Sequence, residues 1–294
     1  MNCPEKSKSD GLYRVKSYLS DLGYLGPALI LFVTFVIVPF AQGIPIAFYK
    51  WDGISPTRTW VGLQNFKTVL IDPAIRNALV VSVKFMLYGL VFSILFGLAF
   101  AMLLHRKRPG ANLARSLIFL PYVISGVLTS YIWQYTYSGF FYEMLGIRNP
   151  LTAQSSAIFG VSVLSVWHNT GFCMVIFIAG LNAVPEDLYE AAKMEGANAP
   201  QRFFHVTLPM ISSSFTVTVT MLLAFGMKIF DFPYIVTQGG PGRATESLAI
   251  VIYRNIFTYW KAGYGQAIAY VFTLFLFVVT FAASKLMRSW EVEQ

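Results

Sequence analysis

Residues 190–209 read EAAKMEGANAPQRFFHVTLP, and this polar stretch lies between two long apolar stretches at 157–181 and 211–231. Gly196 and Pro209 interrupt the stretch, so one continuous helix is not expected there. The pattern predicts a short helix, a turn and a second short helix between two membrane-spanning helices. A compact hairpin in that place presents a surface that a partner protein can hold.

The composition of the chain sets its class. Of its 294 residues, 56% are hydrophobic and 12% are charged, whereas a soluble domain carries about 25% charged residues. The mean hydropathy is +0.58, so lipid must be the solvent for much of the chain. The net charge of +8 comes from Lys and Arg residues that often lie just outside apolar runs. This pattern favours anchoring at lipid headgroups, and no nucleic-acid partner is expected.

The long apolar runs predict the membrane spans. A helix of about 20 mainly apolar residues crosses the bilayer core, and continuous runs favour helices over the alternating strands of a barrel. The predicted fold class is an all-α polytopic membrane protein with six transmembrane helices. The first run is predicted to be a retained anchor, because its core from Leu25 to Phe40 exceeds the roughly 7–15 residues of a signal peptide. The predicted spans lie at about 24–49, 78–104, 115–136, 157–181, 211–231 and 265–285.

Lys and Arg residues predict the orientation. Six spans put both termini on one side, and the positive-inside rule favours that side as the cytoplasmic one. The short connector with Arg106, Lys107 and Arg108 gives most of this signal. We therefore expect a multi-pass protein of the cytoplasmic (inner) membrane with a cytoplasmic N-terminal segment at 1–20, a cytoplasmic C terminus and a cytoplasmic loop at 182–210.

Residues around the polar stretch explain how its hairpin forms. Pro185 suits the first turn of a helix, and Glu186 and Asp187 place negative charge near the positive end of that helix. Gly196 supplies the left-handed residue that ends the helix. The alternative is an amphipathic helix on the membrane surface, which usually carries a face rich in Lys and Arg. Acidic residues outnumber the single Lys193 here, and this favours a protein partner.

The polar stretch also resembles a known loop. Glu-Ala-Ala, three residues, Gly-Ala, five residues, Phe and then Leu-Pro is similar to the coupling loop by which ABC importer permeases seat on their ATPase subunits. Pro200 departs from the pattern, because many relatives have Trp there. The resemblance implies a coupling loop at 185–209. Its ATPase-coupling residues would be Glu190, Ala191, Ala192, Gly196, Ala197, Phe203 and Pro209.

A second motif is similar to carbohydrate-type permeases of the maltose-permease-like and glycerol-phosphate-permease-like kind. Residues 230–246 read FDFPYIVTQGGPGRATE, and VGLQNF at 61–66 continues the likeness upstream. The resemblance implies type I ABC importer permease architecture, with an ABC transmembrane type-1 domain at 72–286. It also implies two cytoplasmic ABC ATPase subunits, a second homologous permease subunit and an extracytoplasmic solute-binding protein as partners, besides the lipid bilayer. The binding-protein face would include Gly239, Gly240 and Pro241, and the alternative is an outer hairpin without a partner.

The sequence contains no pattern for bond-breaking chemistry. It has no Gly-Lys dipeptide, so the P-loop that binds ATP is missing, and it has no His-Glu-x-x-His and no His/Cys cluster. We therefore expect no catalytic residue, no metal site and no cofactor. The resemblance implies that a separate ATPase drives transport of a sugar, oligosaccharide or glycerol phosphate. The alternative is a secondary transporter or channel, which predicts intramembrane ion ligands and repeat symmetry that the sequence does not show. A membrane-embedded enzyme ranks last.

Polar and aromatic residues within the spans are candidates for the solute pathway. Lys228 and Asp231 are three residues apart, so they would share a helix face and could pair. In the alternative, Lys228 extends to the membrane interface and Asp231 is its counter-ion. For the remaining candidates, the alternative is ordinary helix packing. The pathway candidates are Trp133, Tyr137, Asn169, Lys228 and Asp231, near Ser125, Thr129, Ser130, Trp167, His168 and Thr170.

Overall fold

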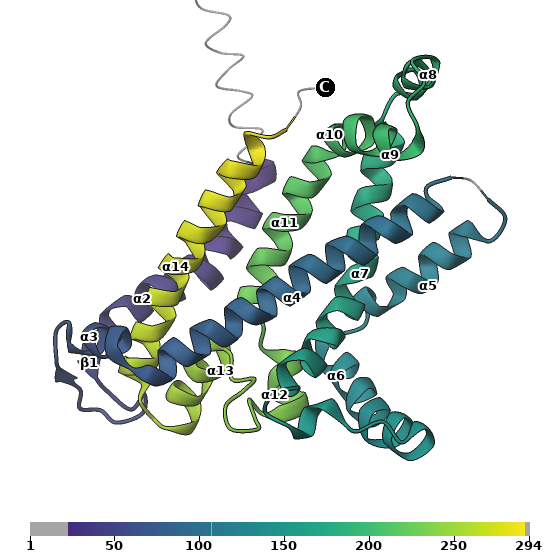
Figure 1. The fold of residues 1–294 in the computed structure, drawn as a ribbon. Helices are drawn as coiled ribbons and strands as arrows, with labels where there is room; N and C mark the ends of the chain where they lie inside the picture. The colour runs from purple at the N-terminus through teal and green to yellow at the C-terminus, as the bar shows by residue number, and fades with distance from the viewer. Residues whose placement is uncertain (1–22, 107, 292–294) are drawn as a thin grey trace, which may run out of the picture.

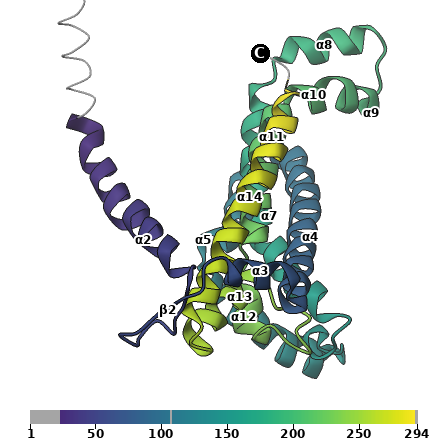
Figure 2. The ribbon, with the colours of Figure 1, turned by 90° about the vertical axis from the view of Figure 1, so that its left-hand side faces the viewer.

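The computed structural model describes residues 23–106 and 108–291, which form an elongated bundle of helices (Figure 1). The predicted N-terminal segment at 1–20 lies outside the described residues. The bundle has two distinct ends. A helical hairpin (α8 and α9) projects at one end, and α12, α13 and a short strand pair lie at the other (Figures 1 and 2).

The described elements follow in chain order. The first half of the chain contains η1 (Val33–Ile37), α2 (Val38–Ile46), β1 (Tyr49–Lys50), β2 (Thr59–Trp60), α3 (Gln64–Ile71), α4 (Pro73–Leu104), α5 (Ala111–Val123), α6 (Gly126–Tyr135), η2 (Thr136–Met144) and η3 (Pro150–Thr152). The second half contains α7 (Ala157–Ala183), α8 (Glu186–Met194), α9 (Ala199–Arg202), η4 (Phe203–Thr207), α10 (Leu208–Met210), α11 (Ser212–Met227), α12 (Asp231–Thr237), α13 (Leu248–Tyr253), η5 (Arg254–Thr258) and α14 (Ala262–Arg288).

Within the described residues, five helices are long and apolar enough to span a membrane, and a bent pair makes up to six. Their bounds agree with the predicted spans to within a few residues at most ends. The five helices are Gly23–Ile46, Pro73–Leu104, Ala157–Ala183, Ser212–Thr237 and Ala262–Arg288, and the bent pair is Ala111–Val123 with Gly126–Met144.

The bent pair corrects the predicted third span. A single span at 115–136 was expected, but the axis turns by 101° between α5 and α6. Ile124 and Ser125 both have extended backbone, and the Ser125 hydroxyl accepts a hydrogen bond (3.3 Å) from the Leu128 N–H to begin α6. Pro121 contributes to this end of α5, because its missing N–H removes one helical hydrogen bond.

The fifth span is also interrupted. The helix α11 ends at Met227, with Lys228 after it, and α12 begins at Asp231. Lys228 and Asp231 therefore belong to two different helices, and the predicted sharing of one helix face is wrong. The physical reason is that the helical period used for the prediction stops at the break.

The central packing depends on small residues in α4. Gly89, Ser93, Gly97 and Ala101 recur every fourth residue and are buried, which makes a flat stripe along the helix. This stripe lets α7 approach closely, as small residues do in membrane helix pairs. A Cβ atom added to Gly97 would lie 2.4 Å from the Cβ atom of Cys173 in α7.

We expect Gly97→Val to destabilise the bundle. The added side chain meets both the side chain and the backbone at Cys173, and such overpacking costs about 1–3 kcal/mol. Thermal unfolding of the purified chain measures the effect. Gly26→Val is the matched control, because open space surrounds Gly26, and equal unfolding temperatures for the two variants would contradict the packing described.

The first helix stands apart from the bundle. Residues Gly23–Ile46 diverge from the other spans toward the start of the chain (Figure 2), and nearly all their side chains are exposed. The helix contacts the bundle near its end, where Gly43 lies against Gln266 and Tyr270 of α14. Its apolar surface therefore faces lipid or another protein.

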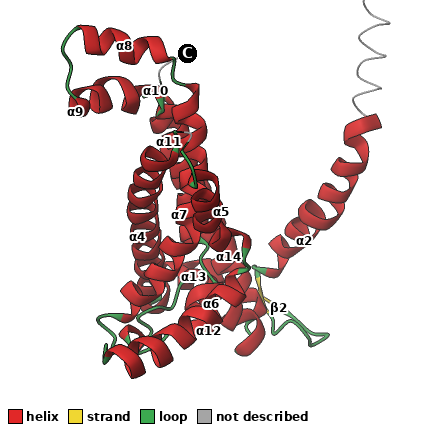
Figure 3. Cartoon of the chain, turned by 90° about the vertical axis from the view of Figure 1, so that its right-hand side faces the viewer, coloured by secondary structure: helices red, strands yellow, loops and turns green. Residues whose placement is uncertain are grey.

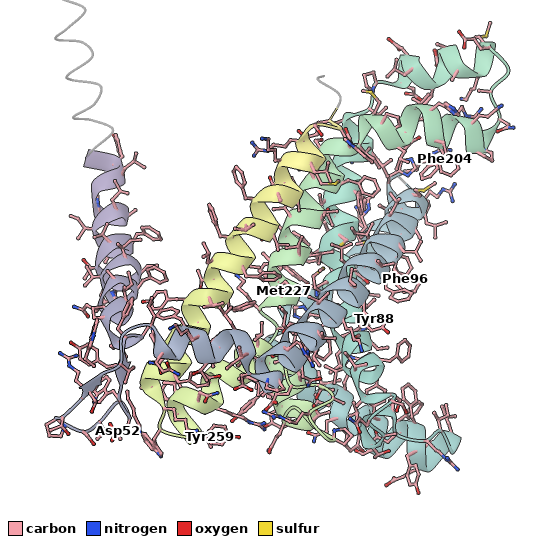
Figure 4. The ribbon with its side chains drawn as sticks, turned by 60° about the vertical axis from the view of Figure 1, so that its left-hand side comes forward. Asp52, Tyr88, Phe96, Phe204, Met227 and Tyr259 are labelled. Atoms are coloured by element: carbon pink, nitrogen blue, oxygen red, sulfur yellow. The ribbon has the colours of Figure 1, made fainter. Side chains whose placement is uncertain are left out.

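A small strand pair and the helix α3 cover the end away from the hairpin. β1 and β2 are antiparallel, with Tyr49 opposite Trp60, in a chain that is otherwise nearly all helix and loop (Figure 3). Asp52 stabilises the loop between them, because its carboxylate accepts hydrogen bonds from the Ser55 side chain and from the N–H groups of Ile54 and Ser55. The same hydrogen bonds lower the pKa of this carboxyl to about 2. Figure 4 shows Asp52 at the opposite end from Phe204 of the helical hairpin.

Candidate functional site: a terminal hairpin and an intramembrane cavity

The terminal hairpin is built by local sequence signals. Glu186 and Asp187 occupy the first turn of α8, and Lys193 lies in its last turn, so all three suit the helix dipole. Gly196 has φ +80°, the left-handed conformation that the sequence predicted for this corner. The N–H of Gly196 donates to the Lys193 carbonyl (3.0 Å), and the N–H of Ala197 donates to the Ala192 carbonyl (2.9 Å).

The second arm of the hairpin begins with a capping box that sequence reasoning missed. The Asn198 side chain accepts a hydrogen bond from the Gln201 N–H (2.9 Å), and the Gln201 side chain accepts one from the Asn198 N–H (2.8 Å). A polar cap residue followed three positions later by Gln is a recognisable signal for a helix start. The box lies beside Pro200, so the departure from the family pattern leaves a well-formed helix start.

The root of the hairpin ties its two arms together. The hydroxyls of Tyr189 and Thr207 are 3.1 Å apart and share a hydrogen bond, which joins α8 to η4. The Arg202 guanidinium donates to the Ala197 carbonyl at the corner (3.1 Å). These bonds and the caps make the hairpin a body with a defined shape.

The two arms of the hairpin expose large apolar side chains. Met194 is 89% exposed and Phe204 is 60% exposed, although both are large and hydrophobic. Leu188 in α8 is 40% exposed, so large apolar side chains lie uncovered on both arms of the hairpin. Such a surface on a rigid projection is suited to contact with a partner. Of the predicted coupling residues, Glu190, Ala191 and Gly196 are exposed at this hairpin, while Ala192, Ala197, Phe203 and Pro209 are half-buried.

A cavity of about 520 Å³ lies where the two interrupted spans meet. The break between α5 and α6, the break between α11 and α12, and the middle of α7 and α4 all contribute to its walls. Broken helices expose backbone groups and polar side chains within a membrane only where a cavity or protein surrounds them. Among the lining residues are Ser165, His168, Asn169, Lys228 and Asp231.

The polar side chains of the cavity are held in place by hydrogen bonds. The Asn169 amide nitrogen donates to the Ser165 carbonyl (2.8 Å) and the Ser165 hydroxyl (3.3 Å). The His168 Nε2 atom is 3.1 Å from the Ile124 carbonyl, which lies at the break after α5. Because a carbonyl only accepts, this contact assigns the proton to Nε2.

Asp231, the first residue of α12, lies against the first residue of α6. A Cβ atom on Gly126, the first residue of α6, would be 2.9 Å from the Asp231 Oδ2 atom. The positive end of the α6 dipole therefore faces this carboxylate. Asp231 does not form the predicted ion pair with Lys228. The two ion pairs in the described part of the chain both involve Glu246.

Trp133 and Tyr137 lie outside this cavity. Tyr137 is buried and donates its hydroxyl to the Gly160 carbonyl (3.0 Å), and its ring lies 5.2 Å from that of Trp133. Trp133 also packs edge-on against Trp167 (5.8 Å). The structure thus brings together Asn169, Lys228 and Asp231, and leaves the two aromatic residues in a separate cluster.

The Gly-Gly-Pro loop has an internal framework that the sequence did not reveal. Glu246 is 1% exposed, and its carboxylate pairs with Arg243 (2.5 Å) and Arg254 (2.5 Å). Gly239 is buried against Glu246, since a Cβ atom there would lie 3.2 Å from the Glu246 Cβ atom. Gly240 and Pro241 are half-buried, so the exposed part of the loop is Gly242 with Arg243.

The comparisons with known proteins agree with this arrangement. The family of binding-protein-dependent transport system inner membrane components matches residues 93–290. A probable starch degradation products transport system permease protein from Thermoanaerobacterium thermosulfurigenes is 31% identical over 276 residues, which cover 92% of this chain and 94% of the relative. The trehalose/maltose transport system permease protein MalF from Thermococcus litoralis is 30% identical over 278 residues, with 91% and 93% covered.

The fold is similar to that of solved transporters. A chain of a bacterial ABC transporter involved in the import of the acidic polysaccharide alginate has a TM-score of 0.77 at 20% identity, covering 95% of this chain and 98% of that chain. A chain of the MetNI methionine ABC transporter has a TM-score of 0.53 at 17% identity, covering 75% and 99%. The predicted all-α permease fold is confirmed.

The chain belongs to the family of binding-protein-dependent transport system inner membrane components. It is the transmembrane permease subunit of an ATP-binding-cassette importer. The terminal hairpin and the intramembrane cavity are therefore the two candidate sites for its role in transport.

Proposed function

We propose that this permease carries a carbohydrate across the cytoplasmic membrane, with its hairpin in the cytoplasm. Two ATPase subunits would act on the hairpin and its counterpart in a second permease, and a solute-binding protein would deliver the sugar outside. The names of the relatives, which concern starch products, trehalose and maltose, support the carbohydrate class. The observation that supports this mechanism is the rigid hairpin at one end of the bundle, with its exposed apolar side chains.

The coupling residues have distinct roles in this proposal. The exposed Glu190 and Ala191 lie on the outer face of α8, where a partner would touch them. Gly196 makes the corner, and Ala197 and Phe203 hold its shape from the half-buried side. Pro209 lies in α10, directly before the fifth span, so movement of the hairpin passes into α11.

The cavity is the proposed place of the solute. Asn169 offers an amide, Asp231 a carboxylate and Lys228 an ammonium group, and Tyr122 and Phe232 add aromatic faces to the same walls. Amide and carboxylate groups bond sugar hydroxyls, while aromatic rings cover the apolar faces of sugar rings. The helix breaks on two sides allow the walls to move without unfolding a continuous helix.

We expect Asn169→Ala and Asp231→Asn each to lower sugar uptake about fivefold, since a lost hydrogen bond is worth about 1 kcal/mol. The measurement is uptake into liposomes that contain the permeases, the ATPases and the binding protein, with ATP inside. The control is Ser162→Ala, a buried residue of the same helix α7 whose hydroxyl donates to the Ile158 carbonyl (2.7 Å), outside the cavity. Unchanged uptake by both cavity variants would contradict the proposed solute site.

The same liposomes test the alternative of a secondary transporter or channel. The proposal expects no uptake without ATP or without the ATPase subunits. Uptake by the permease chains alone, driven by an ion gradient, would overturn it.

A further inference from the structure

A second polar cavity lies at the root of the hairpin and has no part in the proposed solute path. Its volume is about 440 Å³, and it lies between the end of α4, the end of α7 and the two arms of the hairpin. Met102, Leu181 and Val184 form its apolar side. The candidate spans end at Leu104 and Ala183, so this side lies at the depth where the membrane interior meets the headgroups.

The polar side of this cavity is rich in positive charge. Arg106 comes from the end of α4, Lys193 from α8 and Arg202 from α9, and His105 lies beside them. Glu186 is the one carboxylate among the described lining residues. The ion pairs of the described chain all involve Glu246 at the other end, so none of them neutralises these cations.

The end of α4 does not supply the missing negative charge. Its final carbonyls are already bonded by Arg115, whose guanidinium donates to the Leu104 carbonyl (3.0 Å) and to the His105 carbonyl (3.1 Å). Arg115 thus compensates the negative end of the α4 dipole. The three cations in the cavity therefore outnumber its one carboxylate, and an anionic ligand could balance the remaining positive charge.

We propose that this cavity binds a phosphate group, and that the phosphate belongs to an anionic phospholipid. Arg matches phosphate oxygens with a planar set of donors, and Lys adds a point charge. Basic pockets between membrane helices on the cytoplasmic side bind such headgroups. The apolar side at the span ends suits the glycerol and upper acyl chain, which a free phosphate lacks.

The bound headgroup would connect two elements. Arg106 lies just after the end of α4, whereas Lys193 and Arg202 belong to the hairpin, so one phosphate would bridge the bundle and the hairpin. An anionic lipid would then hold the hairpin at a fixed angle to α4. This inference concerns the permease chain alone and holds whichever solute the importer carries.

Native mass spectrometry of the full-length chain, purified in mild detergent with equal phosphatidylglycerol and phosphatidylcholine, tests the proposal. We expect at least a fivefold excess of retained phosphatidylglycerol for the unmodified chain. Arg106→Gln with Lys193→Gln should remove this excess. Within the described part of the chain, neither side chain takes part in an ion pair, and the unfolding temperature checks that the variant is folded.

The control variant is Arg58→Gln with Lys261→Gln, which removes two exposed cations at the opposite end and should keep the excess. Equal retention by the unmodified chain and the cavity variant, or loss in the control as well, would overturn the proposal. A second arm adds inorganic phosphate at millimolar concentration. Continued retention of the lipid supports a lipid site, while displacement of the lipid by phosphate at that concentration would show a site for free phosphate instead. If the cavity variant does not fold, Arg106→Gln alone, at an exposed position, replaces it.

Discussion

Replacing Gly196 with Val is expected to lower solute-stimulated ATP hydrolysis at least tenfold, with the membrane bundle still folded. Gly196 has φ +80° and open space around it, so the effect comes from backbone strain and not from a clash. The left-handed conformation costs a residue with a Cβ atom about 1–2 kcal/mol, and a β-branched residue suffers more. Relief of this strain should change the angle between α8 and α9, so that the hairpin would no longer fit the ATPase as proposed.

The control for this prediction keeps the left-handed backbone at the corner but adds a polar side chain. Gly196→Asn introduces a side chain that tolerates the left-handed conformation, and it should retain most of the stimulated activity. Glu190→Ala, on the exposed face of α8, should insert normally and also lose stimulation. Full stimulation in both Gly196→Val and Glu190→Ala would show that the hairpin does not couple ATP hydrolysis to transport.

Replacing Glu246 with Ala should loosen the Gly-Gly-Pro loop and lower the unfolding temperature. The change leaves Arg254, with 25% of its side chain exposed, without its carboxylate partner. Removing one member of a fully buried pair costs about 3–5 kcal/mol. The cost here should be about 2–3 kcal/mol because Arg243 is 53% exposed and remains hydrated. We expect the unfolding temperature to fall by about 5 °C or more.

The functional consequence of Glu246→Ala separates the loop from the hairpin. The loop between Gln238 and Glu246 would no longer present Gly242 and Arg243 in one arrangement, so stimulation by the binding protein should fall while unstimulated ATP hydrolysis remains. Glu143→Gln is the control, because Glu143 is an exposed acid outside this loop. Equal effects of the two changes on stability and stimulation would contradict the proposed role of this loop.

Local signals in the sequence were sufficient for the hairpin and for most spans. Pro185, Gly196 and the acids of α8 act on their immediate neighbours, so their positions alone predict the corner that the structure shows. The apolar runs likewise predict spans from the hydropathy of each segment, without reference to the other segments. The capping box of Asn198 and Gln201 carries an equally local signal and could have been predicted.

The breaks and the buried charge depend on tertiary structure. Residues 115–136 are apolar on both sides of Ile124, so hydropathy predicts one span where the axis turns by 101°. Lys228 and Asp231 were placed on one helix face because a period of 3.6 residues was extended across an interruption that packing produces. The burial of Glu246 also requires Arg254 to approach from η5, and this contact between separate segments cannot be read from the loop sequence alone.

The most direct test of the account is the position of the hairpin tip in the assembled importer. Met194→Cys, in a chain that also carries Cys3→Ser and Cys173→Ala, places one reactive thiol at an 89% exposed site. We expect a membrane-impermeant thiol reagent to reach this residue only from the cytoplasmic side. We also expect a short bifunctional crosslinker to join it to the ATPase subunit. Labelling from the outside, without a crosslink to the ATPase, would contradict the account.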